Sequence, residues 1–328
     1  MKRRALLVGG AASAALAATR GLAQQPARSY RIGVLIPMVR DAGEKYLAAL
    51  RDQLARHGFV EGRNLRIDAQ YVAYGTRPNL DAVRELVALK PDAIFACSTL
   101  VTQAAQAATG TMPIVFARVS DPVVSGIVKD YARPGGNATG ITNRFFELAA
   151  KRLDLVRELR PSAKRVAVVS GVFDSVLEAA MVFAERAAKQ LGFELVRIAT
   201  HGAWAQGIQA SKREGAHTVL VVTPFAILGL RSLADEVIRQ TLEQRMPAVY
   251  AETETVEMGG LMSYATNLSD DLRRGADLLA RVLRGESPAE LPVDQASRFE
   301  LAVNLKTARA IGLKIPQSLL VRADRVIE

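Results

Sequence analysis

The feature that most constrains the fold of this 328-residue chain is an alternation of strand-like and helix-like segments. Short runs rich in β-branched residues, such as YRIGVLIP at 30–37, alternate with longer segments, such as 44–58, in which leucines recur at helical spacing. This alternation predicts parallel sheets with helices on both faces. The first round of expected strands is 30–37, 64–72, 93–98 and 113–119, and its expected helices are 44–58, 77–92 and 99–110.

The same pattern then starts again. Its expected strands are 164–171, 193–200, 218–224 and 247–252, and its expected helices are 175–192 and 270–285. Several landmarks recur at an offset of 134 residues: Ile32-Gly33-Val34 and Val166-Ala167-Val168, Gly58-Phe59 and Gly192-Phe193, Met112-Pro113 and Met246-Pro247. The chain therefore reads as two similar α/β lobes, each an open, Rossmann-like sheet.

A glycine-rich stretch, ARPGGNATGIT at 132–142, lies between the two rounds and leads into an expected crossing strand at 138–143. A surface turn is the ordinary interpretation of such a stretch. Its position at the junction favours a hinge, because glycine absorbs backbone changes that other residues resist. A second pair of glycines occurs in EMGGLMSYATN at 257–267. The predicted hinge residues are Gly135, Gly136, Gly140, Gly259 and Gly260.

Two crossings between the lobes, followed by a shared C-terminal part, give a definite expectation for the domains. The N-terminal lobe is expected to comprise 24–140 and 266–290, and the C-terminal lobe 141–265 and 291–328.

The first 23 residues have the pattern of a secretory signal peptide. A basic start at Lys2, Arg3 and Arg4 is followed by a short apolar stretch and by small residues near a cleavage site at Ala23. The arginine pair leaves both the Sec and the twin-arginine route open. We therefore expect an exported, periplasmic protein that is not inserted stably in the membrane.

Charge and cysteine content narrow the class of protein further. Removal of the signal peptide leaves 39 basic and 33 acidic residues, a net charge of +6 that is scattered along the chain. Nucleic-acid binding calls for clustered charge, so no nucleic-acid partner is expected. The single Cys97 cannot form an internal disulfide and lies in an apolar run, where a cysteine is usually a small buried hydrophobe.

In open parallel sheets, ligands bind outside the carboxyl ends of the strands, and this rule selects the candidate site. Some candidates have an ordinary structural role as an alternative. Ser98 and Thr99 begin a helix, Asp121 precedes a proline in a turn, and Asp174 precedes a helix that it could cap. The candidate ligand-binding residues are Pro37, Arg40, Ser98, Thr99, Arg118 and Asp121 in the first lobe, and Asn143, Ser170, Asp174, Thr223, Glu252 and Tyr264 in the second.

Catalytic and metal-binding patterns are missing from the sequence. It has no P-loop, no G-x-S-x-G elbow and no dinucleotide fingerprint after a strand. His57, His201 and His217 are far apart and lack metal-ligand spacing. We therefore predict no catalytic residue, no metal and no cofactor.

Three long blocks resemble a known family, the tryptophan/tyrosine-type ABC transporter substrate-binding proteins. The blocks are VSDPVVSGIVKDYARPGGNATGIT at 119–142, GGLMSYATN at 259–267 and FELAVNLKTARAIGLKIPQSLLVRADRVIE at 299–328. The resemblance implies the type I periplasmic binding fold and a monomeric receptor that delivers a small solute to an inner-membrane ABC permease. It also implies that Ser98 and Thr99 hold a ligand carboxylate and that Asp121 belongs to the family's Asp-Pro loop.

The second lobe departs from the family pattern. Where members usually carry a phrase such as P-D-P-F, this chain has TPFAILG at 223–229, without an acidic group. The ligand implied is an amino acid or a simple organic acid, with an aromatic acid included.

Two other classes of protein share this two-lobed α/β architecture. A two-lobed α/β enzyme acting on a small acid in the same cleft needs a nucleophile or base with a partner, and the loops offer isolated polar groups. A ligand-sensing regulator of this fold carries an N-terminal helix-turn-helix, where this chain has an export signal. A binding protein is therefore the expectation, and an enzyme is the alternative.

Overall fold

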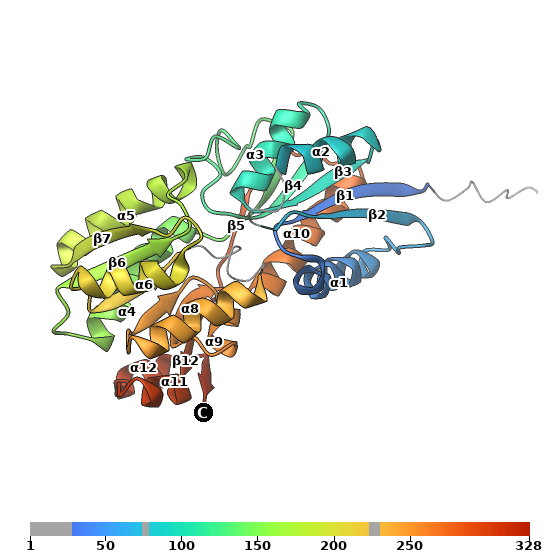
Figure 1. Cartoon of the computed structure of the whole chain (residues 1–328). Helices are drawn as coiled ribbons and strands as arrows, with labels where there is room; N and C mark the ends of the chain where they lie inside the picture. The colour runs from blue at the N-terminus through green and yellow to red at the C-terminus, as the bar shows by residue number, and fades with distance from the viewer. Residues whose placement is uncertain (1–27, 74–78, 223–229) are drawn as a thin grey trace, which may run out of the picture.

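The chain builds two separate β-sheets, each covered by helices on both faces, in the computed structural model (Figure 1). The structure describes residues 28–73, 79–222 and 230–328. The expected signal peptide and the candidate residue Thr223 lie outside these ranges. Within them, no helix combines the length and the apolar character needed to cross a bilayer.

Sheet A has six strands in the order β11-β5-β4-β3-β1-β2, all parallel to their neighbours. Strands β1, β3 and β4 are rich in β-branched and aromatic residues and are buried over most of their length, as strands covered on both faces are. The strands are β1 (Tyr30–Ile36), β2 (Leu65–Tyr71), β3 (Ala93–Cys97), β4 (Ile114–Val119), β5 (Ala138–Thr142) and β11 (Asp294–Gln295).

Two helices cover each face of sheet A. Helices α1 (Arg40–Arg56) and α10 (Leu268–Leu283) share one hydrophobic core with one face of the sheet, and α2 (Asn79–Ala88) and α3 (Thr99–Ala108) cover the other. Leu47, Leu50 and Leu54 form the buried stripe of α1, as their spacing predicts. Figure 1 shows α10, coloured orange, beside the blue α1, although the two lie at opposite ends of the sequence.

Sheet B has seven strands in the order β13-β12-β10-β9-β8-β6-β7. Its neighbours are parallel except for the antiparallel pair β10 and β12. The strands are β6 (Arg165–Ser170), β7 (Glu194–Ala199), β8 (Thr218–Val221), β9 (Ala248–Tyr250), β10 (Met262–Thr266), β12 (Phe299–Asn304) and β13 (Arg325–Ile327).

Helices of the second lobe also divide between two faces. One face shares a core with α4 (Phe145–Leu159), α5 (Ser175–Leu191), α11 (Leu305–Ala310) and α12 (Gln317–Arg322). The other face packs against α6 (Trp204–Arg213) and α8 (Arg231–Glu243), and the short α9 (Thr253–Glu257) follows β9.

The order of strands confirms the repeat seen in the sequence. In sheet A the run β5-β4-β3-β1-β2 has the same order as β10-β9-β8-β6-β7 in sheet B. The landmark residues Ile32–Val34 and Val166–Val168 lie in β1 and β6, which occupy the same place in the two runs. The chain thus contains two similar doubly wound lobes, as predicted.

The chain passes between the lobes three times. The passages lie between β5 and α4, between β10 and α10, and between β11 and β12. Strand pairing within sheet A ends at Thr142 and resumes at Asp294. The chain therefore leaves one sheet for the other lobe after Thr142, after Thr266 and after Gln295. The lobe boundaries at 140/141, 265/266 and 290/291 stay a prediction.

Candidate ligand cleft between the lobes

The carboxyl edges of the two sheets meet at the strands β4 and β9. Arg118 lies at the end of β4, and its guanidinium contacts Glu252, the second residue after β9. A second contact joins the lobes nearby, where the Tyr46 hydroxyl of α1 donates a 3.1 Å hydrogen bond to Glu254 of α9. The edges at which open parallel sheets bind ligands therefore face each other, as the cleft prediction requires.

Predicted residues of the first lobe divide between this edge and its rim. Ser98 and Thr99 begin α3, and the Thr99 hydroxyl accepts a 3.0 Å hydrogen bond from the backbone N–H of Ser120 after β4. Pro37 is buried at the end of β1. Arg40 is exposed at the start of α1, where it pairs with Glu44 at 3.4 Å and lies over the Tyr71 ring.

Asp121 has a local structural role. Its Oδ1 atom accepts hydrogen bonds from the backbone N–H groups of Val123 at 2.9 Å and Val124 at 3.0 Å. The carboxylate also raises the pKa of Tyr131, after the larger effect of burial on that phenol. Its expected contact with a ligand stays a prediction.

Predicted residues of the second lobe occupy several different places. Asp174 caps α5 by accepting a 2.9 Å hydrogen bond from the N–H of Leu177, the alternative that the sequence left open. Ser170 is buried at the end of β6 and donates to the carbonyl of Val172. Tyr264 lies in the middle of β10 and stacks on Phe299, which pairs with Thr266 at the end of that strand.

Asn143 follows β5 at the first passage between the lobes. It is 5% exposed, and its Oδ1 atom has no hydrogen-bond partner. The hydroxyl of Thr253, at the start of α9, is likewise buried without a partner. Buried polar groups are nearly always hydrogen-bonded, so both atoms are available to a ligand or to water.

The predicted hinge glycines lie outside the three passages. Gly135 and Gly136 belong to the turn before β5, where Gly135 has φ +72° and its N–H donates to the carbonyl of Ala289. Gly140 lies inside β5, and a Cβ atom there would be 2.1 Å from the carbonyl oxygen of Phe116. Gly259 and Gly260 lie in the turn before β10. Close packing of β5 on β4 is reason enough for glycine at 140, and a hinge role for the five stays a prediction.

The most heavily buried charges of the described residues surround Arg118. Its Nη2 atom is 2.5 Å from Glu252 Oε1, and its Nη1 atom is 2.8 Å from Asp271 Oδ2 and 3.0 Å from the Thr266 hydroxyl. The side chains of Arg118 and Glu252 are each 1% exposed. The sequence made both residues candidates for ligand binding outside the carboxyl ends of the strands, whereas the structure places them in contact with each other at the lobe junction.

Burial dominates the protonation of this cluster. It raises the pKa of Glu252 to about 7, against the opposing effect of Arg118. It also raises the pKa of Asp271. Two carboxylates share one guanidinium, and together they hold the pKa of Arg118 above its ordinary value although burial acts in the other direction.

Arg152 of α4 is a second buried cation close to the junction. Its Nε atom donates to the carbonyl of Tyr264 at 3.0 Å and its Nη2 atom to that of Ala251 at 3.4 Å, whereas Nη1 has no partner. The guanidinium lies 5.1 Å from the centre of the Phe145 ring. Burial lowers the pKa of Arg152 to about 10, so the side chain is charged at neutral pH.

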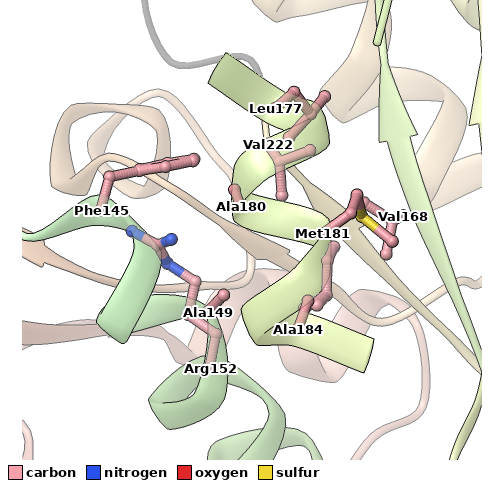
Figure 2. A pocket seen from close by; sticks show the side chains of 10 residues that line it. Phe145, Ala149, Arg152, Val168, Leu177, Ala180, Met181, Ala184 and Val222 are labelled. Carbon is pink, nitrogen blue, oxygen red and sulfur yellow. The ribbon is translucent and has the colours of Figure 1, made fainter. Parts of the chain in front are cut away.

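A small cavity adjoins Arg152 between α4 and α5. Figure 2 shows the guanidinium beside Phe145 on one side of the cavity and Leu177, Ala180 and Met181 on the other. The volume is about 20 Å³, room for a group the size of one water molecule. Apart from Arg152, every lining residue is apolar.

An apolar cluster lies at the same edge of sheet B. Its members come from the start of α4, from the N-terminal half of α5, and from the segments shortly after β6, β8 and β9. We call it the carboxyl-edge cluster: Phe145, Phe146, Leu177, Ala180 and Ala251, with Phe173, Val176, Ala179, Phe183 and Val222 packed against them. Apolar side chains with a few convergent polar groups are typical of small-molecule sites.

Among the described residues, no group of three or more His, Cys, Asp or Glu side chains is arranged to hold a metal ion. Cys97 is buried in the core of the first lobe, as expected, and burial raises the pKa of its thiol to about 12.

Comparison with known proteins agrees with this geometry. A sequence model of the family described as "ABC transporter substrate binding protein" matches residues 31–327. The chain belongs to this family.

One named protein and two solved structures illustrate what this substrate-binding protein is similar to. A "Tyrosine-binding protein" of Clostridioides difficile (strain R20291) is 28% identical over 281 residues, which cover 85% of this chain and 78% of the relative. The structure of an ABC domain in complex with L-Trp from Streptococcus pneumonia is 24% identical, covers 91% of this chain and 100% of that one, and superimposes with a TM-score of 0.81. The ligand-free, open structure of a substrate binding protein with adhesive properties from Clostridium difficile is 27% identical, covers 91% and 99%, and has a TM-score of 0.66.

Sequence reasoning missed several polar residues of this substrate-binding protein. Arg152 lies on the apolar stripe of α4 with Leu148, Leu155 and Leu159, and a charged residue at such a position is a readable signal. Asp271 lies in the same way on the buried stripe of α10. Tyr46 and Glu254 carry no comparable signal, because only the approach of α1 to α9 brings them together.

Proposed function

We propose that this substrate-binding protein is the solute receptor of an ABC importer, that it closes its two lobes around a small carboxylate-bearing ligand, and that it delivers this ligand to an inner-membrane permease. The observation that carries the proposal is the meeting of the carboxyl edges of two similar lobes in a chain of this family. A ligand that contacts both edges binds the closed arrangement better than the open one, which is what closure requires.

The chemistry at the edges favours an aromatic or otherwise apolar ligand. The carboxyl-edge cluster supplies four phenylalanines, and two of them, Phe145 and Phe146, directly follow the passage between β5 and α4. Buried Oδ1 of Asn143, the hydroxyl of Thr253 and Nη1 of Arg152 have no protein partner. Together these groups suit an aromatic amino acid or a related organic acid, and two relatives, one named a tyrosine-binding protein and one solved in complex with L-Trp, support this class.

In the first lobe, the ligand carboxylate is proposed to meet the start of α3. Ser98 precedes this helix, and its own side chain makes no capping hydrogen bond to the first turn. The free N–H groups of a helix start favour a negative charge. Asp121 at the neighbouring loop is proposed to face the ammonium group when the ligand is an amino acid.

Location and assembly follow from the same proposal. We infer export directed by residues 1–23, cleavage near Ala23, and a periplasmic monomer that reaches its permease by diffusion. The lobes are proposed to comprise 24–140 with 266–290, and 141–265 with 291–328.

A thermal-shift screen of residues 24–328 tests the ligand class. The panel contains L-tryptophan, L-tyrosine and L-phenylalanine, indole-3-acetate without the ammonium group, tryptamine without the carboxylate, and glucose. A ligand at one hundred times its Kd adds about 2.7 kcal/mol to the free energy of unfolding. Stabilisation by the carboxylates but by neither tryptamine nor glucose supports the proposal. Stabilisation by tryptamine alone contradicts the carboxylate requirement.

A further inference from the structure

Arg118 and Glu252 occupy equivalent positions of the two lobes. They are 134 residues apart, the offset at which the sequence landmarks recur, and β4 and β9 hold the same place in the two sheets. In a symmetric pair of units, a surface that lies on the symmetry axis meets its own equivalent. Equivalent positions that kept the same charge would repel each other there. This chain carries opposite charges at the two positions, and they form a 2.5 Å contact.

The backbone at Arg118 is arranged to aim this side chain. Its φ is +58°, in the left-handed region that side chains other than glycine rarely adopt. The pairing of β4 with β5 shifts its register between Ala117 and Val119, so Arg118 is the extra residue of a bulge. Bulges redirect a side chain, and strained residues of this kind persist where the surroundings over-determine them.

The first lobe fixes the guanidinium from the other side. Asp271, on α10, accepts from Nη1, and its Oδ2 atom also accepts a 2.6 Å hydrogen bond from the Thr266 hydroxyl. Asp271 on α10 and Thr266 at the end of β10 therefore hold the guanidinium of Arg118 in position to contact Glu252. Separating the lobes at this point breaks the contact between two side chains that are each 1% exposed.

We propose that the buried Arg118–Glu252 pair is an inter-lobe latch, which holds the end of β4 against the end of β9, so that the cleft opens only when the pair separates. Asp271 positions Arg118, and the hydrogen bond from Tyr46 to Glu254 is a second, weaker contact across the same junction. This inference goes beyond the proposed function, because it holds whichever ligand the cleft takes.

The distance between the lobes measures the latch directly. Val124 after β4 and Val182 on α5 are 53% and 56% exposed, and each can be replaced by cysteine for spin labelling, whereas Cys97 is buried. Double electron–electron resonance without ligand gives the distribution of distances between the two labels. In Glu252→Ala, Arg118 keeps Asp271 as its partner, so no buried cation is left without an acid.

We expect a single narrow distribution for the otherwise unaltered protein, and a broader distribution with a longer mean for Glu252→Ala. The double variant Arg118→Met/Glu252→Leu removes both charges and should show the same shift, whereas Arg118→Lys should keep most of the narrow population. The matched control, Arg165→Met/Glu194→Leu, removes an Arg–Glu pair inside one lobe and should leave the distribution unchanged. An unchanged distribution in Glu252→Ala and in the double variant overturns the latch. So does an equal broadening in the control.

Discussion

Nη2 of Arg118 lies 2.5 Å from Oε1 of Glu252, and 134 residues of chain separate the two. The contact joins Arg118 at the end of β4 to the second residue after β9, the positions that the internal repeat makes equivalent. Opposite charges at this one place make the two halves of the repeat complementary to each other. The ligand edges of both sheets are held close together as a result.

Removing the guanidinium should destabilise the fold strongly. In Arg118→Met, Glu252 and Asp271 stay buried and lose their shared cation, so we expect the free energy of unfolding to fall by about 3–5 kcal/mol. Urea denaturation at pH 8 measures the change. Arg165→Met is the control, since it breaks a more exposed pair with Glu194 and should cost at most about 1 kcal/mol. Equal losses in the two variants would contradict the buried-cluster account.

Glu252 should make the stability depend on pH. Burial raises its folded-state pKa to about 7, above the ordinary value of 4.5 that applies to the unfolded chain. The folded protein thus binds a proton that the unfolded chain has released, and the contribution of Glu252 to stability decreases as the pH rises from 4.5 through 7. Within that window each pH unit changes the free energy by up to about 1.4 kcal/mol.

The measurement is the difference between the unaltered protein and Glu252→Gln in thermal unfolding between pH 5 and pH 8. Taking the difference isolates Glu252 from the groups around it, which are Arg118, Arg152, Glu254 and Asp271. The advantage of the glutamine variant should grow with pH. A difference that stays constant over this range would show that Glu252 does not titrate there.

Gly140 and Gly136 should respond oppositely to alanine. A Cβ at 140 would lie 2.1 Å from the Phe116 carbonyl oxygen, so Gly140→Ala must push β5 away from β4 and should cost several kcal/mol, as other overpacked sites do. Gly136 has no atom within 4 Å of such a Cβ and no positive φ. Gly136→Ala should therefore be neutral or stabilising by up to about 1 kcal/mol. Chemical denaturation measures the free energy of unfolding of the two variants. Similar values for the two would refute the packing explanation.

Asp121 should affect binding and stability separately. Asp121→Ala removes the acceptor for two backbone N–H groups and should cost about 1 kcal/mol of stability while the fold stays intact. Asp121→Asn keeps an acceptor and should leave stability nearly unchanged. If the carboxylate faces the ligand as proposed, calorimetry will show weaker binding in both variants. Unaltered affinity in both variants would mean that Asp121 has only its structural role in the turn.

Much of the fold could be read from the sequence because its signals are local and repeated. A buried apolar run predicted β1, leucine spacing predicted α1, and the offset of 134 residues indicated the equivalence of the two lobes. Boundaries were less certain. The sequence predicted a helix from residue 44, whereas α1 begins at Arg40, because the exposed residues of its first turn carry no apolar periodicity.

Other elements left a weaker trace. Helix α4 directly follows the passage between the lobes, and its apolar stripe is interrupted by Arg152, so the sequence analysis did not predict it. Strand β12 enters sheet B antiparallel to β10 after the third passage between the lobes, an arrangement that local patterns do not encode.

The candidate site was predictable in place but not in detail. The rule that ligands bind at carboxyl edges selected Ser98, Thr99, Arg118 and Glu252, which do lie at the facing edges. Sequence could not show that Arg118 and Glu252 bind each other, because that contact depends on the relative placement of two lobes. The unpartnered Nη1 of Arg152 is likewise a property of the packed structure alone.

The central claim is that the cleft between the lobes binds one small carboxylate-bearing solute and releases it unchanged. It is tested most directly by calorimetric titration of residues 24–328 with the best ligand from the thermal-shift screen, followed by mass spectrometry of the recovered compound. The account predicts saturable binding of one ligand per chain and recovery of the ligand unaltered. Conversion of the compound into a product would contradict the account and favour the enzyme.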